Sequence, residues 1–147
     1  MASDLIDLVR ARLYDAMEKL ARDAVETIRD SLSVQGSVVP FVVSRPGEPP
    51  YNWDNRMIEG IGYFISESTS TMTITFVSNA FDDSGRNFAA DEEGGHWWDG
   101  WAQDFEDNYR WVKISEPHEV APRPYMAPQA VYMAQNAPRF LAQYFGL

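Results

Sequence analysis

Cysteine is absent from this sequence of 147 residues. Its absence excludes disulfide bonds, thiol catalysis and thiolate metal sites, and it fits a reducing compartment. No apolar run approaches the roughly 20 residues that a helix needs to cross a bilayer. The N-terminus has no basic region followed by an apolar block, so we expect no signal peptide.

Catalytic motifs are equally scarce. The chain has two histidines, His96 and His118, and it has neither a Gly-x-Ser-x-Gly motif nor a phosphate-binding loop. Ser-His-Asp chemistry therefore has no supporting pattern. Carboxylates are plentiful, so a pair of them doing acid–base work stays open, although no particular pair stands out.

Basic residues are scarce in one part of the chain. The formal net charge is −10, and residues 82–107 hold nine acids and one base, whereas residues 1–36 hold seven acids and five bases. An acidic chain does not suit the nucleic-acid backbone, because binding needs Lys and Arg to displace counterions. Such a chain can still line a passage for DNA, since like charge prevents sticking.

The hydrophobic fraction is 45% and the aromatic fraction 14%, which suits one globular domain, residues 1–147. Apolar residues at steps of three or four predict a helix over residues 3–33, with Ser3 as its cap and Gly36 as its stop. A helix of about thirty residues is roughly 45 Å long. Two interpretations stay open: a plain core helix, or one that also offers surface to a neighbouring subunit. The apolar stripe consists of Ile6, Val9, Leu13, Met17, Leu20, Ala24 and Ile28.

Strand patterns follow this helix. Pro40 cannot donate a ladder hydrogen bond, so the first pattern is an edge strand or an extended arm. The short link between the second and third predicts an antiparallel hairpin, and Gly60 and Gly62 indicate a bulge or a close backbone approach. Alternating or β-branched side chains predict strands within four segments: 37–44, 58–66, 71–77 and 109–115.

Residues 79–108 have no sustained period, and we interpret them as an acidic, Trp-rich surface excursion with a short helical turn near residues 98–105. Loops this long in a compact domain are usually functional. Four prolines within residues 116–128 predict an extended run. Residues 129–145 predict a C-terminal helix, which Pro138 either kinks or restarts.

An acid and histidine cluster lies in the excursion, formed by Asp91, Glu93 and His96. Glu93 and His96 have the i, i+3 spacing of carboxylate-bridged iron sites, but such sites need two of these motifs and the chain has one. A solvated acidic loop therefore explains the cluster better than a metal site does. The tryptophans of the Trp97–Trp101 loop suit a hydrophobic plug, an interface anchor or a sugar platform. A small acidic hydrolase or carbohydrate-binding module using this loop is therefore one hypothesis.

Two proline-rich segments carry a resemblance to a known family. Residues 44–50 read Ser-Arg-Pro-Gly-Glu-Pro-Pro, and residues 123–128 read Arg-Pro-Tyr-Met-Ala-Pro just before the final helix. In this order, after an amphipathic helix, they resemble the tail-completion (head–tail joining, or neck) proteins of long-tailed bacteriophages. That family typically carries Ser-x-Pro-Gly-x-Pro-Pro after its first helix and Arg-Pro-aromatic-hydrophobic-x-Pro-Ala before its last. Here Gln129 stands between the proline and the alanine.

The resemblance implies an α+β fold with a long N-terminal helix, a small, mostly antiparallel sheet and a C-terminal helix. It implies a structural virion protein that is not an enzyme, has no cofactor, metal or membrane, and resides in the host cytoplasm during assembly. Several copies, expected to be six, would form a ring between the head connector or stopper and the tail terminator or tail tube. DNA would pass through without specific binding. A tail-terminator protein of the same neck is the nearest alternative.

Two sets of residues follow from this resemblance, and both have structural roles. The proline-stiffened segments are pre-ordered, so docking them on a neighbour costs little entropy. For subunit or partner contacts we predict Arg45, Pro46, Pro49, Pro50, Trp53, Arg123, Pro124, Tyr125 and Met126. For an acidic loop facing the channel we predict Asp82, Asp83, Asp91, Glu92 and Glu93.

Overall fold

The computed structural model of this chain describes most of its backbone and most of its side chains. The described residues are 2–38, 41–42, 44–52, 55–81, 85, 87–98, 101–103, 111–113 and 118–147. Within these ranges, only the backbone is described for residues 37–38, 41–42, 91, 96–98, 101–103, 111–113 and 118–120.

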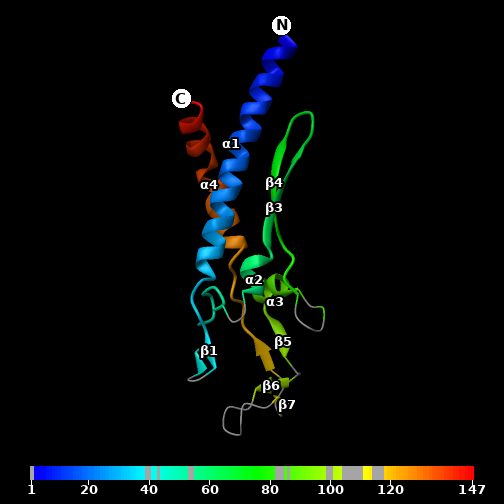
Figure 1. Ribbon diagram of the computed structural model, residues 1–147, viewed down its shortest axis with the longest axis vertical. Helices are drawn as coiled ribbons and strands as arrows, with labels where there is room; N and C mark the ends of the chain where they lie inside the picture. The colour runs from blue at the N-terminus through cyan, green and yellow to red at the C-terminus, as the bar shows by residue number, and fades with distance from the viewer. Residues whose placement is uncertain are drawn as a thin grey trace.

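Two helices and one hairpin form the largest part of the molecule. Helix α1 (Ala2–Ser31) is the longest element, and helix α4 (Ala127–Tyr144) packs against it. Strands β3 (Ile61–Glu67) and β4 (Met72–Ser78) form a hairpin that lies along a different side of α1 (Figure 1). The α+β fold with a long first helix and a C-terminal helix is therefore confirmed.

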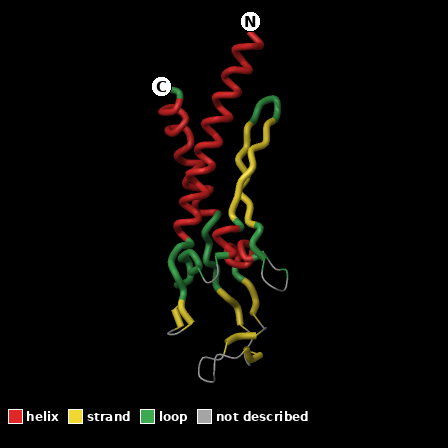
Figure 2. The backbone as a smooth tube through the Cα atoms, in the orientation of Figure 1, coloured by secondary structure: helices red, strands yellow, loops and turns green. Residues whose placement is uncertain are grey.

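Short elements gather at the end of the molecule opposite the N-terminus, as Figure 2 shows. They are α2 (Arg56–Glu59), α3 (Phe88–Gly94), β1 (Ser37–Val38), β2 (Phe41–Val42), β5 (His96–Trp98), β6 (Trp101–Gln103), β7 (Trp111–Lys113) and β8 (His118–Val120). The expected antiparallel pairing is confirmed for the described strands, which form four separate pairs: β1–β2, β3–β4, β5–β8 and β6–β7.

The β3–β4 hairpin has the predicted antiparallel pairing, with Ile61 opposite Ser78 and Glu67 opposite Met72. Its turn is closed by the backbone N–H of Ser68, which donates to the Thr71 carbonyl oxygen at 2.8 Å. Gly60, just before β3, is a site of close backbone approach, as its sequence position indicated. A Cβ added there would lie 2.7 Å from the backbone nitrogen of Ala80.

The core lies at the C-terminal half of α1. Met57, Ile58, Tyr63, Phe76 and Met126 pack around it at partial exposure, so α2, the hairpin and the start of α4 all contribute to it. Arg29 strengthens this junction, because its guanidinium donates to the carbonyl oxygen of Ile61 at 2.9 Å. The buried cluster consists of Val25, Ile28, Leu32, Ile61, Ala89 and Tyr125.

Cation and ring contacts join α1 to α4 farther along. The guanidinium of Arg12 lies 5.9 Å from the ring centre of Tyr144, which itself stacks with Phe140 at 6.4 Å. Such contacts contribute about 0.5–1 kcal/mol at exposed sites. They hold the C-terminal end of α4 to the middle of α1.

Several predicted boundaries need correction. Helix α1 ends at Ser31, where a tight turn follows, with Leu32 donating to the Arg29 carbonyl oxygen at 3.1 Å. Within the predicted edge strand at residues 37–44, the described residues form two short paired strands, β1 and β2. Pro40 itself lies outside the described residues.

The helical turn predicted near residues 98–105 is also wrong, because Trp98 ends β5 and residues 101–103 form β6. The helix of this region is α3, whose first turn is capped by the Asn87 side chain accepting from the Ala90 N–H at 3.3 Å. Helix α4 begins at Ala127 and continues through Pro138, so this proline does not restart it.

Candidate assembly interface

The N-terminal half of helix α1 exposes large apolar side chains. Leu5, Ile6, Leu8 and Val9 are 63%, 60%, 60% and 53% exposed. In the other half of the same stripe, Ile28 is 1% exposed. Contiguous exposed apolar surface of this kind marks an interaction site more often than isolated apolar residues do. The predicted stripe therefore serves two purposes, with a core at one end and a free surface at the other.

A groove separates this half of α1 from the turn of the β3–β4 hairpin. Its volume is about 400 Å³, and the hairpin contributes residues 67–72. One hydrogen bond spans it, from the Arg10 guanidinium to the carbonyl oxygen of Thr69 at 3.4 Å. The apolar side chains along the groove are Leu5, Ile6, Val9, Leu13 and Met72.

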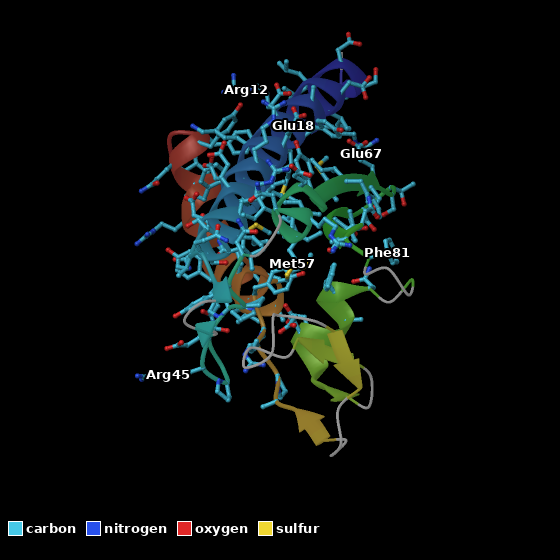
Figure 3. All side chains as sticks on the ribbon, turned by 60° about the horizontal axis from the view of Figure 1, so that its bottom comes forward. Arg12, Glu18, Arg45, Met57, Glu67 and Phe81 are labelled. Carbon is cyan, nitrogen blue, oxygen red and sulfur yellow. The ribbon has the colours of Figure 1, made fainter. Side chains whose placement is uncertain are left out.

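An acidic hollow lies beside the groove. Asp7, Asp15 and Glu67 line it together with Arg10 and Tyr14, so three carboxylates face one guanidinium. Figure 3 shows Glu67 on the hairpin, beside the α1 segment that holds Glu18. The groove is therefore apolar along its length and negative along one border.

The two proline-rich segments lie side by side within one chain. The Gly47 N–H donates to the carbonyl oxygen of Pro122 at 3.0 Å. The Arg123 guanidinium donates from Nε to the carbonyl oxygen of Ser44 at 3.2 Å, and Ser44 is 3% exposed. The proline patterns of the two segments did not predict that they bind each other.

The predicted contact residues divide between surface and interior. Arg45 and Pro46 are exposed, and Arg45 reaches away from the body of the molecule (Figure 3). Pro49, Arg123, Pro124 and Met126 are half-buried. Pro50 is buried and Tyr125 is 3% exposed, so neither offers a free surface, and Tyr125 belongs to the core of its own chain. Trp53 lies outside the described residues.

Tyr125 occupies an unusual position for a tyrosine. Among the described residues, its hydroxyl oxygen has no hydrogen-bond partner. Burial raises the pKa of this hydroxyl to about 12, and the negative charges of Glu93 and Glu92 add to the rise. The Ser78 hydroxyl lies near enough to oppose the rise, although outside hydrogen-bonding geometry.

Glu93 caps the start of helix α4. Its Oε1 accepts hydrogen bonds from the backbone N–H groups of Tyr125 at 2.8 Å, Met126 at 2.5 Å and Ala127 at 3.3 Å. A carboxylate here satisfies unpaired donors and interacts favourably with the helix dipole. Glu93 and Tyr125 are 32 positions apart, so no local sequence pattern indicates this contact, and it was not predicted.

Of the residues predicted for the channel-facing acidic loop, Glu93 accepts hydrogen bonds with its carboxylate from the chain's own backbone. Glu92 is half-buried on the same helix α3, and its carbonyl oxygen accepts from the Arg123 N–H at 2.6 Å. Asp82 and Asp83 lie outside the described residues, and Asp91 is described by its backbone alone.

The hydrolase and sugar-binding hypothesis loses Glu93 for the same reason. His96 and the described part of the Trp97–Trp101 loop belong to β5 and β6, whose side chains are not described. Within the described part of the chain, no three His, Asp or Glu residues are grouped so that they could hold a metal ion.

Searches for relatives give no assignment. The chain matches no protein-family model, no curated protein and no solved structure. None of the helices that the structure describes combines the length and the hydropathy needed to span a membrane.

Proposed function

We propose that this chain is a non-enzymatic structural protein of a phage virion. It forms a homo-oligomeric ring at the neck, completes the tail end and joins it to the head connector. The observation that carries the proposal is the exposed apolar half of α1 with its groove, which the chain's own core leaves uncovered. A protein that works alone has no use for such a surface, whereas an assembly protein needs one.

The size of this surface sets what it can do. Fully burying one large aliphatic side chain contributes about 1.5–3 kcal/mol. Leu5, Ile6, Leu8 and Val9 are each a little over half exposed, so covering all four contributes on the order of 4 kcal/mol. Association costs about 4–15 kcal/mol in lost translational and rotational freedom. This surface alone supports weak pairing, and a stable ring needs a second surface on each copy.

The proline-rich unit supports the proposal in another way. The loop at residues 44–50 is fixed by Arg123 and by the Gly47 hydrogen bond, so the exposed Arg45 and Pro46 are presented on an ordered loop. A pre-ordered loop loses little entropy when a partner covers it. The net charge of −8 over residues 82–107 would let DNA pass through such a ring without adhering.

Deletion of the gene from the phage that encodes it tests this function. Filled heads and separate tails should accumulate, and wild-type protein supplied in trans should restore joined particles. Ile6→Asp, on the exposed half of α1, should fail to restore them, whereas the exposed change Glu26→Ala on the same helix should succeed. Joined, infectious particles in full yield without the protein would contradict the proposal.

A further inference from the structure

We infer that the groove between α1 and the β3–β4 hairpin receives the outward face of helix α4 from a second copy of this chain. This inference rests on the proposed function only because it requires that copies of the chain associate. The groove and the α4 face are the two surfaces through which the copies would contact each other. Each copy would offer its groove to one neighbour and its α4 face to another.

Helix α4 has an outward face that is poor in charge. Val131 and Tyr132 are 56% and 57% exposed. Arg139 is the one charged residue in the 18 residues of this helix. A helix that keeps one face in water normally carries several charged residues there. The exposed positions that form this face are Pro128, Val131, Tyr132, Gln135, Pro138, Arg139 and Gln143.

The outward face is not needed for packing within the chain. Met133, Ala137 and Phe140, on the other side of α4, are partly buried. The helix packs on α1, and the Phe140 and Tyr144 rings stack on one another beside Arg12. The exposed face is therefore available to a partner.

The groove and the α4 face lie on different flanks of the molecule. Helix α4 lies on one side of α1 and the hairpin on the other (Figure 1). Because the groove and the α4 face lie on opposite flanks, one two-fold contact between two copies cannot bring both groove–α4 pairs together at once. They match head to tail, and a head-to-tail contact generates a ring when its rotation closes.

The dimensions of the two surfaces agree. The apolar line of the groove runs from Leu5 to Leu13, and the α4 face has its largest side chains between Val131 and Arg139. Each stretch spans eight helical positions, which is about 12 Å at roughly 1.5 Å per residue. Helices that dock in grooves use anchors about three, four and seven positions apart. The apolar residues of the α4 face have this spacing, because Val131 lies three positions after Pro128 and seven before Pro138.

The polar group at the centre of the α4 face also has a counterpart in the groove. Gln135 is an exposed, uncharged polar residue near the centre of this face. The hairpin turn lines the groove with the polar residues 68–71, so the apolar floor on α1 faces a polar wall. An amide side chain both donates and accepts hydrogen bonds, which suits a wall of hydroxyl and carbonyl groups.

The charges agree as well. The hollow along the groove presents Asp7, Asp15 and Glu67 against Arg10. The α4 face brings Arg139 and no acid. A positive group entering a negative border is favourable and fixes the direction of docking. The same border disfavours a second acid-rich α1 helix as occupant.

Cysteine cross-linking tests the contact directly, because the natural chain has no cysteine. A tagged Val9→Cys protein is mixed with an untagged Val131→Cys protein under mild oxidation. We expect a disulfide-linked pair that contains one copy of each. Phe81→Cys replaces Val131→Cys in the matched control, since Phe81 is also exposed, at 49%, and lies on neither surface. A yield no higher than in the control, or only Val9–Val9 pairs, would overturn the inference.

Two interface variants give a second test. Ile6→Asp damages the groove and Val131→Asp damages the α4 face, and each alone should weaken self-association at least about tenfold. Mixed together, they should form pairs and nothing larger, because one intact groove meets one intact α4 face. Normal assembly of Val131→Asp would exclude the α4 contact. Circular dichroism of each variant checks that the monomer remains folded.

The outcomes separate this inference from the proposed function. If head–tail joining requires the protein but the Val9–Val131 link does not form, the neck role stands and the α4 contact is wrong. If the link forms while virions assemble without the protein, the contact stands and the neck role is wrong. Glu67→Arg should restore association lost in Arg139→Glu, with a change of about two- to fivefold for this charge pair.

Discussion

The guanidinium of Arg123 donates from Nε to the carbonyl oxygen of Ser44 at 3.2 Å, across 79 positions of sequence. Ser44 is almost fully buried, so its backbone has no access to water as an alternative partner. The neighbouring Gly47 N–H donates to Pro122 in the same region. These contacts make the two proline-rich segments one structural unit.

Arg123→Ala is expected to lower the free energy of unfolding by about 1.5–3 kcal/mol, the usual range for a hydrogen bond to a charged donor. The loss arises because the buried carbonyl oxygen of Ser44 is left without its partner. Urea denaturation followed by circular dichroism measures it. Arg45→Ala is the matched control, since that side chain is exposed, and should change stability by less than about 0.5 kcal/mol. Equal stabilities of the two variants would contradict the assignment.

Glu93→Ala is expected to destabilise the chain by about 1–3 kcal/mol, because several N–H groups at the start of α4 lose their acceptor. Glu93→Gln keeps an acceptor oxygen but loses the charge, so it should lie between wild type and Glu93→Ala. Glu59→Gln, an exposed change on α2, provides the control. The same denaturation experiment compares them, and a Glu93→Ala protein as stable as the control would exclude the cap.

Tyr125 makes stability depend on alkaline pH. Its pKa is about 12 in the folded chain and about 10 when unfolded, so the folded state holds the proton longer. The contribution of Tyr125 to the free energy of unfolding is therefore fully present below about pH 10. It falls by up to about 3 kcal/mol as pH rises from about 10 to 12. Urea denaturation at pH 8, 10 and 11 measures the fall. Tyr125→Phe should lack this fall in stability, and an identical pH dependence in both proteins would contradict the prediction.

Gly60→Ala should lower the free energy of unfolding by about 1–3 kcal/mol, because the new Cβ would overlap the backbone of Ala80. Gly62→Ala is the matched control on the same hairpin. Its Cβ would lie 3.8 Å from the Val77 Cγ2 atom, an ordinary contact, so its stability should change by less than about 1 kcal/mol. Thermal unfolding ranks the two, and the reverse order would show that the backbone at Gly60 can move freely.

The parts of the fold that could be predicted from the sequence are those with a regular spacing of apolar residues. The stripe from Ile6 to Ile28 predicted α1, and strict alternation over residues 71–77 predicted β4 and its hairpin. Helix α3 is seven residues long, too short for a period to show, and its one local signal was Asn87 as a cap. The strands paired as β5–β8 and β6–β7 are three residues each, below what alternation can define.

Only part of the candidate interface could be predicted from the sequence. The length of α1 exceeds what a small core needs, which raised the possibility of a free surface on this helix. The structure places that surface at Leu5 to Val9, whose apolar side chains are exposed. Burial of Tyr125 and the capping role of Glu93 depend on contacts across more than thirty positions. Such contacts follow from tertiary packing, which no local pattern encodes. The neck role and the ring remain predictions.

Self-association is the central claim, and the mass of the purified protein tests it most directly. Light scattering during size exclusion, at increasing concentration, should show a species of several copies, with closed rings in electron micrographs of the same peak. Ile6→Asp should elute as a monomer of 16.7 kDa under the same conditions. Wild-type protein that stays at 16.7 kDa at every concentration would contradict assembly through these surfaces.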